Sequence, residues 1–150
     1  MAKERVLIAD DNTVNVELLE TYLDGYGYET ATALDGAETL QMVKSFRPNL
    51  ILLDIMMPKM SGFEICDVLK SQPETKRIMI LMVTALTELG DIERAVAAGC
   101  DDYISKPVNK AELLKRIENL LKLQSVTDEL MRLRKYIDRM EDSYGPKRSD

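Results

Sequence analysis

The sequence predicts an α/β protein in which a parallel sheet is covered by helices on both faces and followed by one long helix. Short apolar runs alternate with helical patterns from residue 5 to about residue 107, which is typical of such a sheet. Acidic, hydroxyl or lysine side chains stand at or just past the ends of several runs. No glycine or proline interrupts residues 108–144, so one helix of roughly 50 Å is predicted there at 1.5 Å per residue.

The elements follow in a regular order. We expect strands at residues 5–9, 29–33, 50–53, 78–83 and 102–105. We expect helices at about residues 14–26, 36–46, 63–71 and 88–98, and a last helix that begins soon after residue 108. Asn12 and Asp35 suit helix starts, because their side chains accept hydrogen bonds from free backbone N–H groups. Gly99 suits a helix end, where a left-handed residue is needed.

Composition excludes several classes of function. The net charge of −6 argues against direct binding to nucleic acid or to an anionic membrane, because both need clustered lysine and arginine. Cys66 and Cys100 have no metal-type spacing, and we interpret both as small buried residues. No apolar stretch is long enough for a signal peptide or a membrane span, so a cytoplasmic protein is expected. Because histidine is absent, any phosphoryl group must be carried on another residue.

Polar residues from four different strands are predicted to meet. Asp10 and Asp11 follow the first strand, Asp54 the third, Thr84 the fourth and Lys106 the fifth. In an open parallel sheet the ligand crevice lies outside the carboxyl ends of the strands. The sequence therefore predicts one site that combines three carboxylates, a hydroxyl and an ammonium group.

Three neighbouring carboxylates indicate a bound cation. They repel one another and raise each other's pKa unless a positive charge neutralises them. Mg²⁺ fits best, because it takes oxygen ligands and is held by one or two carboxylates together with phosphate oxygens. We expect Asp11 and Asp54 as direct ligands, Asp10 as a ligand through water, and the Met56 carbonyl as a further protein ligand.

The same residues predict phosphoryl chemistry. Asp54 is the candidate nucleophile, and we expect its carboxylate to be reachable rather than buried in an ion pair. Lys106 and Thr84 suit the negative charge that develops on phosphoryl oxygens. A second acidic pair, Asp101 and Asp102, precedes its strand. That pair is therefore expected at the opposite edge of the sheet, without a metal.

The last helix carries two apolar stripes. The first is expected to face the domain core and comprises Leu113, Leu114, Ile117, Leu120 and Leu121. The second repeats with heptad spacing, typical of a coiled-coil seam, and comprises Leu123, Val126, Leu130, Leu133, Ile137, Met140 and Tyr144. At about 100° per residue the two stripes point in roughly opposite directions. Glu129 and Arg134 take g and e positions that favour a parallel two-stranded coil; the alternative is an amphipathic tail that folds back onto its own domain.

Four separated motifs resemble the receiver domain of two-component response regulators over about residues 3–122. The motifs are Ile8-Ala9-Asp10-Asp11-Asn12, Leu53-Asp54-Ile55-Met56-Met57-Pro58-Lys59-Met60-Ser61-Gly62, Val83-Thr84-Ala85 and Asp101-Asp102-Tyr103-Ile104-Ser105-Lys106-Pro107. The resemblance implies a flavodoxin-like, doubly wound five-stranded parallel sheet of order 2-1-3-4-5. It also implies a cis peptide before Pro107 and an inward turn of Tyr103 as Thr84 moves toward the phosphoryl group.

The resemblance implies a signalling function. We expect Mg²⁺-dependent phosphorylation of Asp54 by a sensor histidine kinase, a phosphotransfer protein or a small phosphodonor. The resulting shift in conformation is expected to be relayed through a parallel homodimer of the last helix to an output partner or a missing output domain such as a diguanylate cyclase. The predicted units are a receiver domain at 1–122, a coiled-coil extension at 123–144 and a tail at 145–150. Slow loss of the phosphoryl group is expected, because Met56 and Leu86 offer no group to orient water.

Three alternative functions fit the sequence less well. A phosphatase of the haloacid dehalogenase type needs a second aspartate two residues after the nucleophile, and Met56 occupies that position. A nucleotide-binding domain needs a glycine-rich loop after the first strand, where Asp10, Asp11 and Asn12 stand instead. A degenerate receiver that acts only as a dimerising scaffold would not need the complete acidic set.

Overall fold

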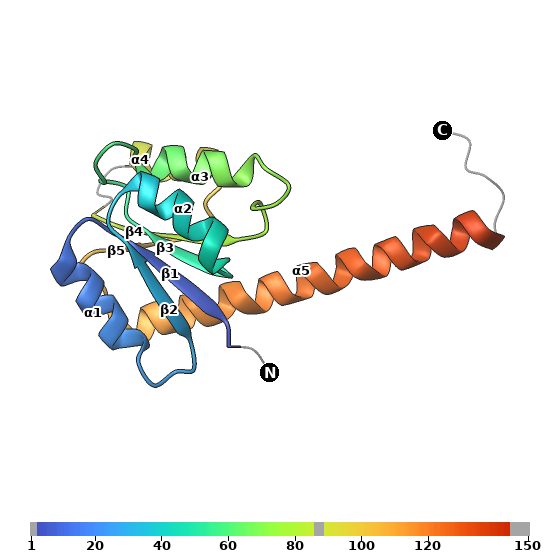
Figure 1. The fold of residues 1–150 in the computed structure, drawn as a ribbon, viewed down its shortest axis with the longest axis horizontal. Coiled ribbons are helices and arrows are strands. Elements are labelled where there is room, and N and C mark those ends of the chain that lie inside the picture. The colour runs from blue at the N-terminus through green and yellow to red at the C-terminus, as the bar shows by residue number, and fades with distance from the viewer. Residues whose placement is uncertain (1–2, 86–88, 145–150) are drawn as a thin grey trace.

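The computed structural model describes residues 3–85 and 89–144, and shows one sheet between two helical layers (Figure 1). The strands of the sheet are β1 (Arg5–Ala9), β2 (Glu29–Ala33), β3 (Leu50–Leu53), β4 (Met79–Thr84) and β5 (Asp102–Ser105). The helices are α1 (Thr13–Leu23), α2 (Gly36–Phe46), α3 (Gly62–Lys70), α4 (Leu89–Ala98) and α5 (Lys110–Tyr144). The predicted alternation of strands and helices is therefore confirmed.

The sheet has the order β2-β1-β3-β4-β5, with every pair parallel. This confirms the flavodoxin-like topology. The ladder continues past the strand ends: Asp10 N donates to Ala33 O at 3.0 Å and Asp54 N donates to Ala9 O at 2.9 Å. The residues after β1 and β3 are thus held side by side. We call this edge, where all strands end, the carboxyl edge, and the opposite one the amino edge.

Two apolar layers hold the fold together, because the central strands are buried on both faces. Helices α2, α3 and α4 cover one face, and α1 and the first part of α5 cover the other (Figure 1). The helical side chains of the first layer include Val43, Ile65, Cys66, Leu69 and Ala95. Those of the second include Val16, Leu19, Leu23, Leu113 and Ile117. Each large aliphatic side chain that is fully buried stabilises the fold by about 1.5–3 kcal/mol.

Element boundaries differ from the prediction by at most three residues, the largest difference being at the end of α1, which is Leu23 instead of residue 26. Strand β4 includes Thr84 as its last residue, because Lys106 N donates to Thr84 O at 3.0 Å and extends the pairing with β5. Asn12 and Asp35 cap α1 and α2 as expected. The predicted start of α4 at residue 88 lies outside the described residues. The cis peptide before Pro107 is present.

Helix α5 is one continuous helix of 35 residues. Its first apolar stripe packs on the sheet as predicted, with four residues buried and Leu114 half-buried; the buried four are Leu113, Ile117, Leu120 and Leu121. Beyond this stripe the helix projects away from the domain (Figure 1). The tail that folds back onto its own domain is therefore not what the structure shows.

Polar contacts at the amino edge hold α5 beyond the apolar stripe. The Gln124 amide donates from Nε2 to the backbone oxygens of Asn49, at 2.9 Å, and of Arg77, at 2.8 Å. One turn later, Asp128 accepts a hydrogen bond from Arg77 Nε at 2.9 Å. Contacts with the domain thus continue past residue 122, and the division of the chain at that residue remains a prediction.

Candidate functional site

Three carboxylates meet at the carboxyl edge. One oxygen atom from each of Asp10, Asp11 and Asp54 lies within 4.8 Å of the others. Asp10 and Asp54 are buried, with 2% and 6% exposure, whereas Asp11 is exposed. Across residues 3–85 and 89–144 no other group of three potential ligands comes this close. The structure therefore brings together the acids that the sequence placed at this edge.

Lys106 supplies the positive charge in this cluster. Its Nζ lies 3.1 Å from Asp10 Oδ2 and 3.4 Å from Asp54 Oδ2. Thr84 is buried at the end of the neighbouring strand, and Ala85 after it is exposed. One ammonium group is therefore shared between two carboxylates.

The expected accessibility of Asp54 needs correction. Its side chain keeps only 7% exposure and is ion-paired with Lys106, whereas the sequence favoured an open carboxylate outside an ion pair. The difference arises because Asp54 N–H bonds to Ala9 O, which continues the strand and keeps the side chain between its neighbours. Of the three clustered acids, Asp11 is the exposed one.

The environment of Asp54 disfavours its charged form. Burial raises the pKa of this carboxyl above 3.8, and the neighbouring charge of Asp10 raises it further. The charge of Lys106 and hydrogen bonds from Met56 N–H and Lys106 oppose the increase in pKa without cancelling it. An additional cation at the cluster would favour the ionised form that a nucleophile needs.

The loop after Asp54 is tightly turned. Met57 N donates to Ile55 O at 3.2 Å and Gly62 N donates to the same oxygen at 2.9 Å. A Cβ added at Gly62 would lie 2.5 Å from Asp54 O, so only glycine allows α3 to start this close to Asp54. The motif that ends at Gly62 did not by itself predict this contact.

The backbone and the side chain of Met56 have different surroundings in this loop. Its N–H donates to Asp54 Oδ1 at 3.4 Å, whereas its side chain is 76% exposed. The backbone therefore faces the site while the side chain points away from the core. Leu86, which the sequence placed near the site with Met56, lies outside the described residues.

Tyr103, the predicted switch residue, lies on β5 between Asp102 and Ile104. It is half-buried and packs against the apolar layer under α2, α3 and α4. Its backbone is paired with Met82, two residues before Thr84. The two predicted switch residues therefore stand on adjacent strands.

The second acidic pair lies at the amino edge, as predicted. Asp101 forms an ion pair with Lys70 at 2.8 Å and accepts a hydrogen bond from Ile80 N at 2.7 Å. Asp102 forms an ion pair with Arg116 at 2.8 Å. Each of these acids has its own basic partner, which sequence reasoning did not identify.

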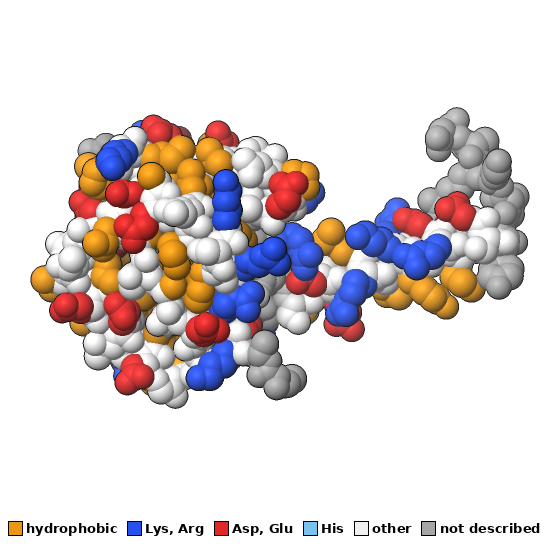
Figure 2. Space-filling model, viewed as in Figure 1, with side chains coloured by type: hydrophobic (Ala, Val, Ile, Leu, Met, Phe, Trp, Pro, Cys, Tyr) orange, Lys and Arg blue, Asp and Glu red, His pale blue; other side chains and the backbone are white. Residues whose placement is uncertain are grey.

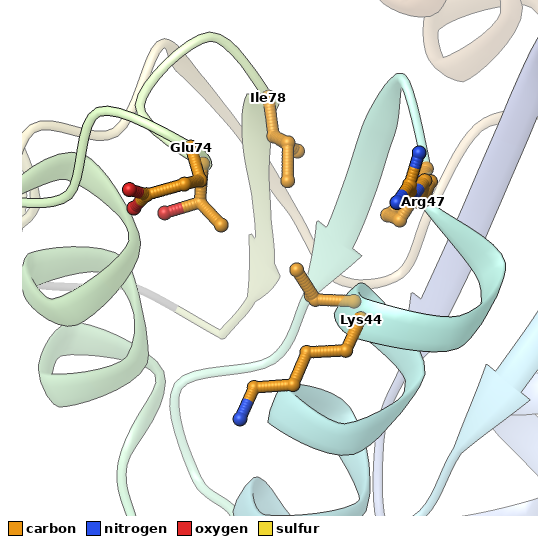
Figure 3. A pocket seen from close by; sticks show the side chains of 7 residues that line it. Lys44, Arg47, Glu74 and Ile78 are labelled. Atoms are coloured by element: carbon orange, nitrogen blue, oxygen red, sulfur yellow. The ribbon is translucent and has the colours of Figure 1, made fainter.

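A hollow of about 540 Å³ also lies toward the amino edge (Figure 3). Lys44 and Arg47, at the end of α2, line one side, and Glu74 and Ile78, before β4, line the other (Figure 3). None of the acidic cluster lines it. The hollow is therefore separate from the candidate site.

The distal part of α5 presents the predicted seam to solvent. Figure 2 shows hydrophobic side chains along one side of this segment and lysine or arginine along the other. The seam side chains are 40–60% exposed and comprise Leu123, Val126, Leu130, Leu133, Ile137 and Met140. The side chain of Tyr144 lies outside the described residues. The seam is therefore largely exposed, although Leu123 at its start lines a hollow together with Lys70 and Met79 of the domain.

The fold and the site define a class of protein, and comparison with known proteins then identifies the family. The doubly wound sheet, with an acidic cluster and a lysine at its carboxyl edge, places the chain among the α/β domains that bind ligands outside the carboxyl ends of their strands. The response regulator receiver domain family matches residues 6–118. The chain belongs to this family, whose members are signalling modules of two-component systems.

Two curated relatives differ in how much of them the chain covers. The response regulator PleD of Caulobacter vibrioides is 40% identical over 126 residues, which are 84% of this chain and 28% of PleD. The polar-differentiation response regulator DivK of Brucella anthropi is 38% identical over 116 residues, which are 77% of this chain and 94% of DivK. This chain thus spans less than a third of one relative and nearly all of the other.

A solved structure supports the fold assignment. The receiver domain of the sensor histidine kinase PA1611 from Pseudomonas aeruginosa has a TM-score of 0.74 and 29% identity, covering 81% of this chain and 99% of that one. It was solved with a magnesium ion coordinated in its active-site cleft. Within the described residues of our chain, no helix is long and apolar enough to cross a membrane.

Proposed function

We propose that this chain accepts a phosphoryl group on Asp54 in an Mg²⁺-dependent reaction and relays the modification through α5. The observation that carries the proposal is the cluster of Asp10, Asp11 and Asp54, with oxygens within 4.8 Å of one another. Among the described residues, Lys106 is the one basic residue that is ion-paired with Asp10 and Asp54. This set of oxygen donors with excess negative charge suits Mg²⁺. The donor of the phosphoryl group is a sensor histidine kinase or a phosphotransfer protein.

The metal ligands are the residues named from the sequence. Asp11 and Asp54 hold Mg²⁺ directly, Asp10 holds it through water, and the Met56 carbonyl completes the protein ligands. When bound, Mg²⁺ supplies positive charge to the carboxylates and to the incoming phosphoryl oxygens. The exposure of Asp11 supports this assignment, because Mg²⁺ keeps several of its waters.

Transfer needs a nucleophile, a leaving group and charge compensation. A lone pair of an Asp54 carboxylate oxygen forms the new O–P bond, and the bond from phosphorus to the donor nitrogen breaks with its electron pair going to that nitrogen. Lys106 neutralises the phosphoryl oxygens, and the Thr84 hydroxyl donates a hydrogen bond to one of them. Lys106 then exchanges part of its contact with Asp54 for one with the phosphoryl group.

The relay to the rest of the protein begins at Thr84. Its movement toward the phosphoryl group leaves space that Tyr103 fills by turning inward, which favours one arrangement of the face formed by α4, β5 and α5. Tyr103 packs against the same apolar layer that contains Met82 and Ala95, so its rotation repacks that layer. Helix α5 is continuous from this face into the seam.

The seam supports a parallel homodimer. Six exposed apolar side chains with heptad spacing are costly to leave in water and pair well in a two-stranded coil. In a parallel pair, Glu129 of one copy lies near Arg134 of the other. Phosphorylation changes the strength or register of this coil and thereby signals to an output partner, or to an output domain such as a diguanylate cyclase, in the cytoplasm.

Phosphorylation is tested by intact mass spectrometry after treatment with acetyl phosphate and Mg²⁺. We expect one phosphoryl adduct on the wild type, none on Asp54→Ala and none when Mg²⁺ is chelated. Asp102→Asn is the matched control, because this acid lies at the amino edge, and it should be modified like the wild type. An unmodified wild type would leave the scaffold alternative, and an adduct on Asp54→Ala would reject Asp54.

The lifetime of the adduct is measured in the same experiment. We expect slow loss of the phosphoryl group, because the exposed side chain of Met56 has no polar group to orient an attacking water. Mass spectra taken over time after removal of the phosphodonor report the decay. A half-life of seconds would contradict this expectation.

The dimer is tested by sedimentation with and without beryllofluoride, a mimic of the acyl phosphate. Leu130→Asp places a charge in the seam and should yield a monomer, whereas Ser125→Asp, off the seam on the same helix, should behave like the wild type. Equal behaviour of the wild type in both states would reject control by phosphorylation. A dimeric Leu130→Asp variant would reject the seam itself.

A further inference from the structure

We propose that Gly36, the first residue of α2, is a positioning residue for the metal-binding loop at residues 55–61. This inference rests on the proposed function, because it concerns the affinity of that loop for Mg²⁺. Gly36 lies on a different element from every residue of the acidic cluster. Its role follows from what a side chain at this position would meet.

Gly36 makes a close approach to the loop. A Cβ added at this residue would lie 2.5 Å from Met60 Cβ, 3.2 Å from Met60 O and 3.4 Å from Ile65 Cδ1. The first contact involves a side-chain atom bonded directly to the backbone, so it cannot be relieved by rotating the end of a flexible side chain. Because Gly36 is also outside the left-handed region, the requirement for glycine is one of space.

A polar contact accompanies this approach. Asp35 caps α2 by accepting a hydrogen bond from Glu38 N at 2.8 Å, and its other oxygen lies 3.8 Å from Lys59 Nζ. Lys59 has a φ of 70°, so the chain turns sharply there. The first turn of α2 thus touches two consecutive residues of the loop, Lys59 and Met60.

At the end of the loop, Gly62 lies close to the backbone of Asp54, because a Cβ added at residue 62 would lie 2.5 Å from Asp54 O. The loop is therefore confined between the start of α2 and the backbone of Asp54. Within it, Met60 N donates to Pro58 O at 2.8 Å and Met57 N donates to Ile55 O at 3.2 Å. One bond closes a turn at residues 58–60 and the other a turn at residues 55–57, which includes Met56. The two turns are joined directly by the peptide bond between Met57 and Pro58, so a displacement of Met60 is transmitted to the turn that carries the Met56 carbonyl.

A methyl group at residue 36 must therefore displace the loop or the helix. Mg²⁺ demands near-ideal octahedral geometry at short distances, so a shift of the Met56 carbonyl by a few tenths of an ångström weakens binding. Partners that orient metal ligands typically change affinity by about 10- to 100-fold when altered. We expect Gly36→Ala to weaken Mg²⁺ binding by about tenfold, at the lower end of that range.

The matched control is Gly90→Ala. Gly90 also lies in the first turn of a helix, α4, but a Cβ added there meets nothing within 4 Å. Mg²⁺ binding is measured by isothermal titration calorimetry, and folding by circular dichroism and urea unfolding. Gly90→Ala should bind Mg²⁺ like the wild type. A general effect of removing a helical glycine would weaken binding in both variants and would overturn the proposal.

A compensating substitution separates positioning from a general loss of stability. Met60→Gly removes the Cβ that Gly36→Ala would strike, so the double variant should bind Mg²⁺ more tightly than the two single effects predict. If Gly36→Ala does not fold, recovery of folding in the double variant supports the contact. A double variant that remains unfolded, or whose two effects are additive, overturns it.

The outcomes distinguish this inference from the proposed function. A wild type that binds Mg²⁺ and a Gly36→Ala variant that binds it equally well would overturn positioning by Gly36 and leave the proposed function intact. A folded wild type that binds no Mg²⁺ would overturn both. Weaker binding in Gly36→Ala alone, with recovery in the double variant, is the result expected.

Discussion

Two adjacent pairs of aspartates, Asp10-Asp11 and Asp101-Asp102, have the same composition and opposite surroundings. The first pair joins Asp54 at the carboxyl edge, where Lys106 is shared between Asp10 and Asp54. In the second pair each acid has its own basic partner at the amino edge. Because all strands run in the same direction, the pair that follows its strand lies at the carboxyl edge and the pair at the start of its strand lies at the amino edge. The same dipeptide thus serves two purposes.

The difference lies in how charge is balanced. At the amino edge, Lys70 also donates to the Ile78 carbonyl at 2.7 Å, so Asp101 closes a satisfied network. At the carboxyl edge, three acids face one lysine, and burial and Asp10 raise the pKa of Asp54. A binding site needs such unbalanced charge, whereas a structural contact does not.

The contrast between the two pairs of aspartates is tested most directly by neutralising one acid of each pair. Asp11→Asn should weaken Mg²⁺ binding by at least about tenfold, or about 1.4 kcal/mol, because it removes a charged ligand. Asp102→Asn should leave binding unchanged. Titration calorimetry checks both, and equal losses in the two variants would show that only net charge matters.

Neutralising an acid at the amino edge should change the stability of the fold instead of the affinity for Mg²⁺. Asp101→Asn should lower the free energy of unfolding by about 1.5–3 kcal/mol, because the Lys70 ammonium, only 18% exposed, loses its charged partner. Urea unfolding measures this change. Mg²⁺ should then raise the stability of this variant as much as that of the wild type, since ligand binding to the folded state is unaltered. A loss of that Mg²⁺ effect would place Asp101 in the metal site.

Neutralising Asp54, a buried acid beside Lys106, should increase the stability of the fold, whereas Asp101→Asn should decrease it. Asp54→Asn should raise the free energy of unfolding without Mg²⁺ by about 0.5–2 kcal/mol, because the folded state no longer holds a carboxylate that burial disfavours. The pKa of Asp54 is raised in the folded state, so its ionisation penalty is present at neutral pH and disappears as the pH falls below 3.8, its ordinary value.

This sign is checked by urea unfolding over a range of pH. The advantage of Asp54→Asn over the wild type should be largest at neutral pH and should shrink as the pH falls through the raised pKa. An advantage that grew toward acid pH would mean that the folded state stabilises the ionised carboxylate. Added Mg²⁺ should also reduce the advantage, because it stabilises only the wild type.

The smallest effect is expected for the exposed ion pair between Arg77 and Asp128. Its side chains are 54% and 30% exposed, and such pairs contribute about 0.2–1 kcal/mol. Arg77→Met should therefore lower the free energy of unfolding within that range, and less so in high salt. Urea unfolding at two salt concentrations checks it. A larger loss would indicate that this pair, rather than Gln124, holds α5 to the amino edge.

Much of the site was predictable because parallel strands all end at one edge. The positions of Asp10, Asp54 and Lys106 past their strands were enough to place them together. The two stripes of α5 were predictable for a related reason, since helical periodicity assigns each residue a direction. The burial of Asp54 was not predictable, because it depends on how far the backbone pairing with Ala9 continues.

The glycines also fall into two groups, those whose role was predictable from the sequence and those whose role was not. Their left-handed use at Gly25 and Gly99 is local and visible in the sequence. The need for glycine at residues 36 and 62 is a contact between segments, with Met60 and with the backbone of Asp54. No periodicity or motif spacing contains such a distance.

The edge that collects the acids and the direction of the exposed seam were determined by the sequence alone, because each depends on local periodicity and chain direction. The order of the strands was implied only by the resemblance to receiver domains. The tertiary structure decided which acids share a lysine, which have their own partners and how tightly the loop after Asp54 is confined. These features depend on distances of a few ångströms between segments far apart in the chain, and packing alone sets such distances.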